Sequence, residues 1–282
     1  VIGKQWRDNF TMYKKILKLM SVGSFAAILG LMSLQVSADK FSSDPQVKGL
    51  QIAEKMKASD RGWSDSQTSL TMVLKNAAGQ ESTRELRAKA LEIQDDGDKS
   101  LNIFDYPRDI KGTAFLSFSH AVGADDQWLY LPALKRVKRI ASRNKSGPFV
   151  GSEFAYEDLA SFEVEKYTYT YLRDEPCKGG TCFVIEQTPV DKYSGYTRLL
   201  NWVDQTEYRS WQTEFYDRRN SLLKTLNVEG FELYLNAYWR ATGMSMVNHQ
   251  TKKTTDLLWS AYEFKIGLTD QDFNKNTLKR AK

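Results

Sequence analysis

The 282-residue chain contains few of the side chains on which enzyme chemistry commonly depends. It has two histidines, His120 and His249, and no H-E-x-x-H sequence that could supply a zinc site. No G-x-S-x-G nucleophile elbow occurs, since residues 243–247 (GMSMV) lack the second glycine. We therefore expect no enzyme activity, no catalytic residue, no metal and no cofactor. A carbohydrate-active β enzyme with paired carboxylates stays open as a weaker alternative, because any two acids could meet in space.

Proline is also scarce, with six residues, and no Ser-, Gly- or Pro-rich run marks a linker. Three lysines (Lys14, Lys15 and Lys18) precede an uncharged run over residues 19–38 that ends in small residues, Val-Ser-Ala. This pattern predicts an upstream extension plus signal peptide over residues 1–38, cleaved before Asp39, and hence export to the periplasm. A retained transmembrane anchor is the alternative, because the run is long enough to span a membrane. Residues 39–282 are expected to form a single domain.

The basic character of the chain resides largely in this leader. The formal net charge is +5, but five of the 40 Lys/Arg and one of the 35 Asp/Glu lie in residues 1–38. The remaining chain therefore has a net charge of only +1. This nearly neutral charge removes the main argument for a nucleic-acid partner.

The only cysteines, Cys177 and Cys182, are separated by Lys-Gly-Gly-Thr. In an exported protein this short spacing predicts a structural disulfide across a hairpin tip. A redox centre would usually have a two-residue spacer, and a zinc site would need further ligands.

One helix is predicted over residues 47–57, with Asp44 as N-cap and Pro45 in the first helical position. After it, apolar and polar residues alternate with a period of two through most of the sequence. About a dozen short strands follow, and a closing helical turn is expected over residues 270–279. This pattern predicts a mainly β protein with one large antiparallel sheet curled on itself. The predicted strands begin near residue 66 and continue at residues 83–93, 100–106, 113–119, 126–131, 136–140, 167–172, 182–187, 196–204, 211–216, 222–229, 243–247 and 256–264.

Residues 125–159 combine an aromatic strand, a basic strand and an aromatic-acidic loop. Within this block, WLYLPALKRVKRI followed by GPFVGSEFAYEDL resembles the outer-membrane lipoprotein-sorting (LolA-like) family. More narrowly, it is similar to the branch found beside RND/MMPL-type exporters, and the likeness extends over roughly the whole mature chain. The resemblance implies an unclosed β-barrel with one or a few helices as a lid over an apolar cavity that takes acyl chains. It also implies an RND/MMPL-type exporter as partner.

Two groups of candidate site residues follow. The aromatic side chains of the block are candidates for an acyl pocket, with the protein core as the alternative; they are Trp128, Tyr130, Phe149, Phe154 and Tyr156. The basic run is a solvated edge strand, a surface for anionic lipid headgroups or a docking site for a partner; its candidates are Lys135, Arg136, Lys138 and Arg139. We expect a monomeric carrier of lipid or lipoprotein acyl chains with transient membrane contact. A module that docks on an exporter and carries nothing is the alternative.

Overall fold

The computed structural model describes residues 41–280. The predicted leader, the cleavage point before Asp39 and the start of the predicted domain therefore lie outside the described residues. Within residues 41–280, no helix has both the length and the apolar character needed to cross a membrane.

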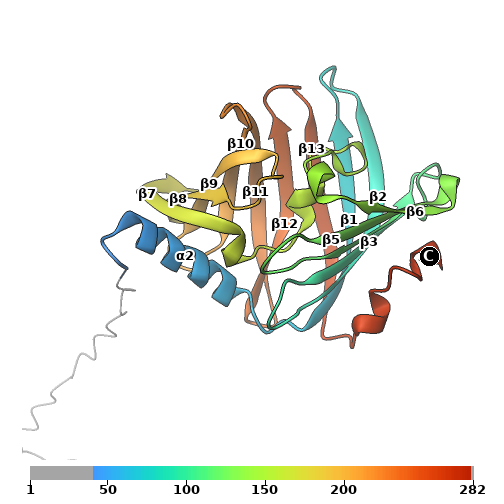
Figure 1. Ribbon diagram of the computed structural model, residues 1–282, viewed down its shortest axis with the longest axis horizontal. Helices are drawn as coiled ribbons and strands as arrows, with labels where there is room; N and C mark the ends of the chain where they lie inside the picture. Colours follow the sequence, from blue (N-terminus) through green and yellow to red (C-terminus); the bar gives the residue numbers. More distant parts are fainter. Residues whose placement is uncertain (1–40, 281–282) are drawn as a thin grey trace, which may run out of the picture. The chain divides into compact units, whose positions relative to one another are not determined.

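A single antiparallel sheet of thirteen strands makes up most of this part of the chain (Figure 1). The order is β6-β5-β4-β3-β2-β1-β13-β12-β11-β10-β9-β8-β7, so the first and last strands pair in the middle. Strands β6 and β7 form the two outer edges and do not pair with each other. The predicted mainly β fold with a large unclosed sheet is confirmed. The strands are β1 (Asp65–Lys75), β2 (Glu81–Leu91), β3 (Lys99–Tyr106), β4 (Ala114–Phe118), β5 (Asp126–Leu131), β6 (Arg136–Ile140), β7 (Tyr167–Cys177), β8 (Gly180–Pro189), β9 (Tyr196–Asp204), β10 (Ser210–Asp217), β11 (Leu222–Tyr234), β12 (Tyr238–Asn248) and β13 (Thr254–Phe264).

Alternation along the strands gives each face of the sheet its own apolar side chains. On β4, Phe115 belongs to the largest core cluster, whereas its neighbour Leu116 packs on the opposite face. We call the Phe115 face the inner face and the Leu116 face the outer face. Near the C-terminus, Phe273 and Leu278 cover the outer face of β3–β5.

The one α-helix described, α2 (Pro45–Ser59), covers the inner face of β7 and β8 through Ile52 and Ala53. Its start follows the predicted pattern, because the Asp44 side chain accepts hydrogen bonds from two backbone N–H groups of the first turn. Gly49 weakens the helix, but a Cβ there would lie 2.8 Å from the backbone nitrogen of Tyr171. The glycine therefore permits the close approach of α2 to β7.

The predicted disulfide is present, joining Cys177 and Cys182 at the tip of the β7–β8 hairpin. Two other expectations need correction. Strand β11 extends to Tyr234 and β12 begins at Tyr238, so both are longer than predicted. The prediction was too short because register shifts around Gly230 interrupt the alternation of apolar and polar residues there. The expected helical turn over residues 270–279 is instead two short 3-10 segments, at Asp270–Asp272 and Leu278–Arg280.

Candidate functional site

The two edges of the sheet are connected by residues 141–166, which we call the crossing segment. It contains four short 3-10 turns and runs over the inner face, where it is drawn in yellow-green in Figure 1. Phe149 is buried against Phe104 of β3 and Phe115 of β4, with ring centroids 5.8 and 5.2 Å apart. The Tyr156 carbonyl accepts a hydrogen bond of 3.0 Å from Gln127 of β5. The segment is thus packed into the half of the sheet formed by β3–β5.

Backbone strain accompanies this packing. Val150 has a φ of 46°, in the left-handed region that a β-branched residue rarely adopts. Such a conformation costs on the order of 1–3 kcal/mol and persists only where its surroundings hold it. The Arg84 side chain of β2 donates a hydrogen bond to the Val150 carbonyl. Packing against the inner face therefore determines the path of the chain at this point.

A buried ion pair fastens the segment to the other half of the sheet. Lys224 of β11 lies 2.6 Å from Asp158, and both side chains are almost wholly buried, 4% and 6% exposed. The Tyr196 hydroxyl of β9 donates to the second oxygen of Asp158 at 2.7 Å. Burial raises the pKa of Tyr196 well above its ordinary value, and the neighbouring carboxylates raise it further. The phenol therefore stays protonated and keeps donating.

Glu157 connects the segment to the β8–β9 loop. Its carboxylate accepts hydrogen bonds of 2.8 Å from the Gly195 N–H and the Ser194 hydroxyl. Burial raises the pKa of Glu157, while these two donors counteract the rise. A Cβ on Gly195 would approach Ser146 to 2.7 Å and Glu157 to 3.0 Å, so only glycine fits this contact.

A cavity of about 390 Å³ remains over the half of the sheet that Phe149 does not fill. It lies between α2, the crossing segment and the inner face of β8–β12. The loop residues Val122 and Val190 line its opening and are 81% and 60% exposed. The apolar lining consists mainly of side chains from these elements: Met56, Phe154, Phe162, Tyr167, Tyr196, Leu199, Phe215, Leu226, Met244 and Met246.

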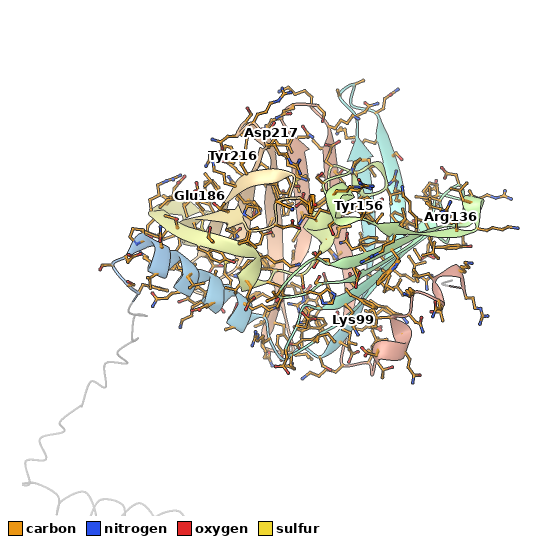
Figure 2. All side chains as sticks on the ribbon, in the orientation of Figure 1. Lys99, Arg136, Tyr156, Glu186, Tyr216 and Asp217 are labelled. Atoms are coloured by element: carbon orange, nitrogen blue, oxygen red, sulfur yellow. A yellow bond between two sulfur atoms is a disulfide. The ribbon has the colours of Figure 1, made fainter. Side chains whose placement is uncertain are left out.

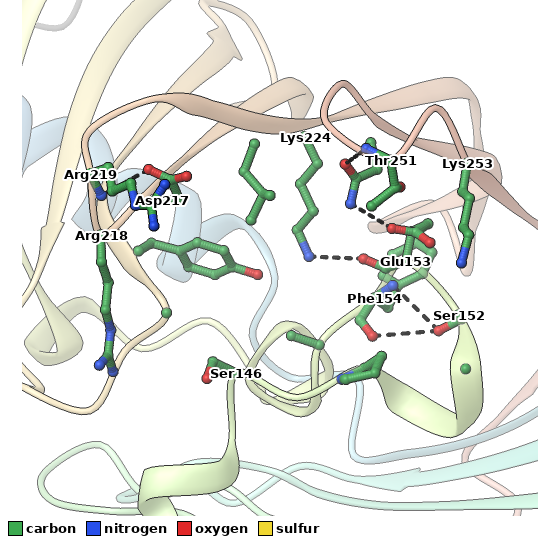
Figure 3. A pocket seen from close by; sticks show the side chains of 17 residues that line it. Ser146, Ser152, Glu153, Phe154, Asp217, Arg218, Arg219, Lys224, Thr251 and Lys253 are labelled. Carbon is green, nitrogen blue, oxygen red and sulfur yellow. Dashed lines mark hydrogen bonds between the residues drawn. The ribbon is translucent and has the colours of Figure 1, made fainter. Parts of the chain in front are cut away.

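A second, wider pocket of about 690 Å³ lies on the other side of Phe154 and Tyr196, which line both spaces. Figure 3 shows Lys224 and Lys253 extending toward the part of the crossing segment that carries Ser152 and Glu153. Arg218 lies on the opposite side of the pocket, where it donates to the Ser194 carbonyl. Its lining has four cationic side chains and two carboxylates. Because Lys224 belongs to this pocket and Asp158 to the cavity, their ion pair lies between the two spaces.

Comparison with known proteins identifies the family. A family model described only as an uncharacterized protein matches residues 96–280. A solved domain from Vibrio parahaemolyticus, named for outer membrane lipoprotein sorting, is 60% identical, with a TM-score of 0.81 over 83% of this chain and 99% of that one. The chain belongs to the outer membrane lipoprotein-sorting, or LolA-like, family.

More distant structures share the fold of this LolA-like protein. A DUF1329 family protein from Desulfovibrio piger is 28% identical, with a TM-score of 0.79 over 84% of this chain and all of that one. A LolA superfamily protein from Nitrosomonas europaea is 23% identical, with a TM-score of 0.65 over 81% of this chain and 98% of that one. Among curated proteins the comparison found no match.

The five aromatic candidates of the LolA-like chain lie on two faces of the sheet. Phe149, Phe154 and Tyr156 are on the inner face, and Figure 2 shows Tyr156 in front of the sheet. Of these, only Phe154 lines the 390 Å³ cavity. Trp128 and Tyr130 pack instead on the outer face, in the cluster that contains Phe273. The five side chains therefore do not form one pocket, and their role in binding an acyl chain stays a prediction.

The basic candidates are all exposed. Lys135 precedes β6, and Arg139 on the outer side of β6 pairs with Asp126. Arg136 and Lys138 alternate with it on the same edge strand, and Figure 2 shows Arg136 at the rim of the folded part. In residues 41–280 neither of these two side chains has an ion pair, so both are available to a partner.

Most of the residues that line the cavity were not predicted from the sequence. Met244 and Met246 lie in the stretch that was compared with a hydrolase elbow, yet both face the cavity. A spacing of two residues puts both methionines on the same face of a strand, as it does Thr213 and Phe215 on β10. This spacing is the signal in the sequence that could have identified them. Which face was the inner one depends on strand pairings that are distant in sequence.

Proposed function

We propose that the protein is a periplasmic carrier that holds an acyl chain in the 390 Å³ cavity. The observation that carries the proposal is the cavity itself, which lies beneath α2 and the crossing segment in a family named for lipoprotein sorting. Its volume falls within the range of about 300–1,000 Å³ typical of ligand sites.

The physical driving force requires no reactive group. Each methylene that leaves water contributes about 0.8 kcal/mol, so a long chain in an apolar cavity gains useful affinity without catalytic residues. Release then depends on an acceptor with a better site, because tight binding alone would retain the cargo. The exposed valines at the opening, Val122 and Val190, provide an apolar path for the tail.

Filling the cavity tests the proposal. Met244→Trp places a larger side chain into the cavity, whereas Leu258→Trp adds the same side chain to the exposed outer side of β13. We expect Met244→Trp to reduce uptake of the neutral dye 1-N-phenylnaphthylamine at least tenfold, and Leu258→Trp to leave uptake unchanged. Circular dichroism checks that both variants fold. Equal uptake by a folded Met244→Trp variant would remove the cavity as the binding site.

The partner belongs to the same proposal. We propose an RND/MMPL-type exporter as the membrane protein that receives or supplies the cargo. Native mass spectrometry of gently purified protein separates the carrier from a docking module. Bound lipid supports the carrier, whereas an empty protein that binds only the periplasmic domain of an exporter supports the module.

A further inference from the structure

A polar patch interrupts the apolar lining of the cavity. Gln187, Asn201 and Thr213 come from the neighbouring strands β8, β9 and β10, and all three are buried. Gln187 follows Ile185 and Asn201 follows Leu199 at a spacing of two on the inner face, and Thr213 precedes Phe215 by the same spacing. The patch is therefore part of the rigid sheet.

Gln187 brings a buried, unused hydrogen-bond donor to this patch. The residue is 3% exposed, and its Nε2 has no hydrogen-bond partner within residues 41–280. The side-chain oxygen of its neighbour Asn201 accepts a hydrogen bond of 2.6 Å from the Ser210 hydroxyl. A buried polar group without a partner costs about 1–3 kcal/mol, so its presence in a cavity wall points to a ligand that satisfies it.

The charges around the cavity indicate which ligand this is. The lining contains two cationic side chains and five carboxylates. Both cations already have partners, since Lys145 lies 2.6 Å from Asp191 and Lys166 pairs with Asp125. An anionic headgroup would thus meet an excess of carboxylates and no free cation in this lining.

The cationic pocket of Figure 3 does not alter this conclusion. Phe154, Tyr196 and the Lys224–Asp158 pair lie between it and the cavity. A headgroup in that pocket could not be continuous with a tail in the cavity unless this buried pair opened.

We infer that the cargo is an uncharged acyl ester or amide, whose carbonyl oxygen accepts a hydrogen bond from the Gln187 carboxamide. The inference rests on the proposed carrier function and narrows its cargo. The carboxylates of the lining disfavour free fatty acids, which are anionic at neutral pH. The Gln187 side chain then recognises the ester or amide group of the cargo, while the apolar lining selects for the length of its acyl chain.

The test compares three competitors of similar chain length in displacing 1-N-phenylnaphthylamine from the full chain at pH 7: tetradecane, methyl myristate and myristate. Wild-type protein should bind methyl myristate more tightly than myristate. Gln187→Met keeps the length of the side chain but removes its amide, and it should weaken methyl myristate about threefold to tenfold while leaving tetradecane unchanged. Gln205→Met is the matched control, because Gln205 also has a buried, unpaired Nε2 but does not line the cavity.

The outcomes distinguish the two proposals. If the dye and tetradecane bind but Gln187→Met leaves the ratio between ester and alkane unchanged, the Gln187 inference is wrong and the carrier proposal stands. The same holds if myristate binds as tightly as methyl myristate. If neither the dye nor any competitor binds to wild-type protein, both proposals fall.

Discussion

At the scale of single residues, burial determines how several polar side chains behave. Asp98, at the β2–β3 turn, accepts a hydrogen bond from the Ile93 N–H, and its own N–H donates to Ser161 of the crossing segment. Burial raises the pKa of the Asp98 carboxyl to about 6, against the opposing effects of the Ile93 N–H and Lys57. Glu163 and Glu92 raise it further.

This shift predicts a pH dependence of stability. Since the pKa of Asp98 is higher in the folded protein than its ordinary value of 3.8, the folded state binds more protons between pH 4 and 6. The contribution of Asp98 to the free energy of unfolding is therefore full below pH 4 and is lost as the pH rises through 6. Asp98→Asn should gain stability relative to wild type between pH 4 and 7, as measured by urea unfolding. A difference that stays constant with pH would contradict the assignment.

At the scale of elements, the crossing segment is the part on which the site depends. It spans the gap between β6 and β7, and it is held by aromatic packing over β3–β5 and by the Lys224–Asp158 pair on the other half. Because this pair also lies between the cavity and the cationic pocket, the same contacts that anchor the segment close the cavity at one end.

Removing one member of this pair should be costly. Lys224→Met leaves a buried carboxylate without its cation, which typically lowers the free energy of unfolding by about 3–5 kcal/mol. Replacing both residues, as in Lys224→Met with Asp158→Leu, should recover part of this loss. Lys75→Met is the control, because Lys75 and Glu81 form an exposed pair that contributes little to stability. Urea unfolding of the variants measures each effect, and equal losses for Lys224→Met and Lys75→Met would contradict a buried ion pair.

At the scale of the folded unit, the open sheet leaves two edges that must not pair with other chains. Helix α2 packs on the inner face of β7, close to the backbone of Tyr171, whereas β6 has exposed cations along its edge. Charged side chains on an edge strand oppose unwanted pairing, and they also attract anionic surfaces. Arg136 and Lys138 do not line the 390 Å³ cavity. We therefore expect that docking and acyl binding can be changed separately.

A charge reversal tests this separation. Arg136→Glu with Lys138→Glu should weaken sedimentation with vesicles that contain anionic phospholipid, or capture by an exporter domain, at least several-fold. Binding of 1-N-phenylnaphthylamine should stay within twofold of wild type. The double variant Arg108→Glu with Lys111→Glu makes the same change of net charge in the exposed β3–β4 turn and should affect neither assay. If both double variants weaken vesicle or exporter binding equally, the change of net charge and not the β6 edge causes the loss.

Local patterns in the sequence determined the mainly β fold, the helix that begins at Pro45, the hairpin disulfide and the family. These features depend on neighbours within a few residues, such as the Asp44 cap, or on short motifs. The tertiary structure alone decided which aromatic side chains share a face: Trp128 and Phe154 belong to the same block of sequence, residues 125–159, but they lie on opposite sides of one sheet. It also decided that Lys224 meets Asp158 and that Gln187 faces a cavity. Such contacts join strands far apart in the chain, and a shift of one residue in strand register would reverse them.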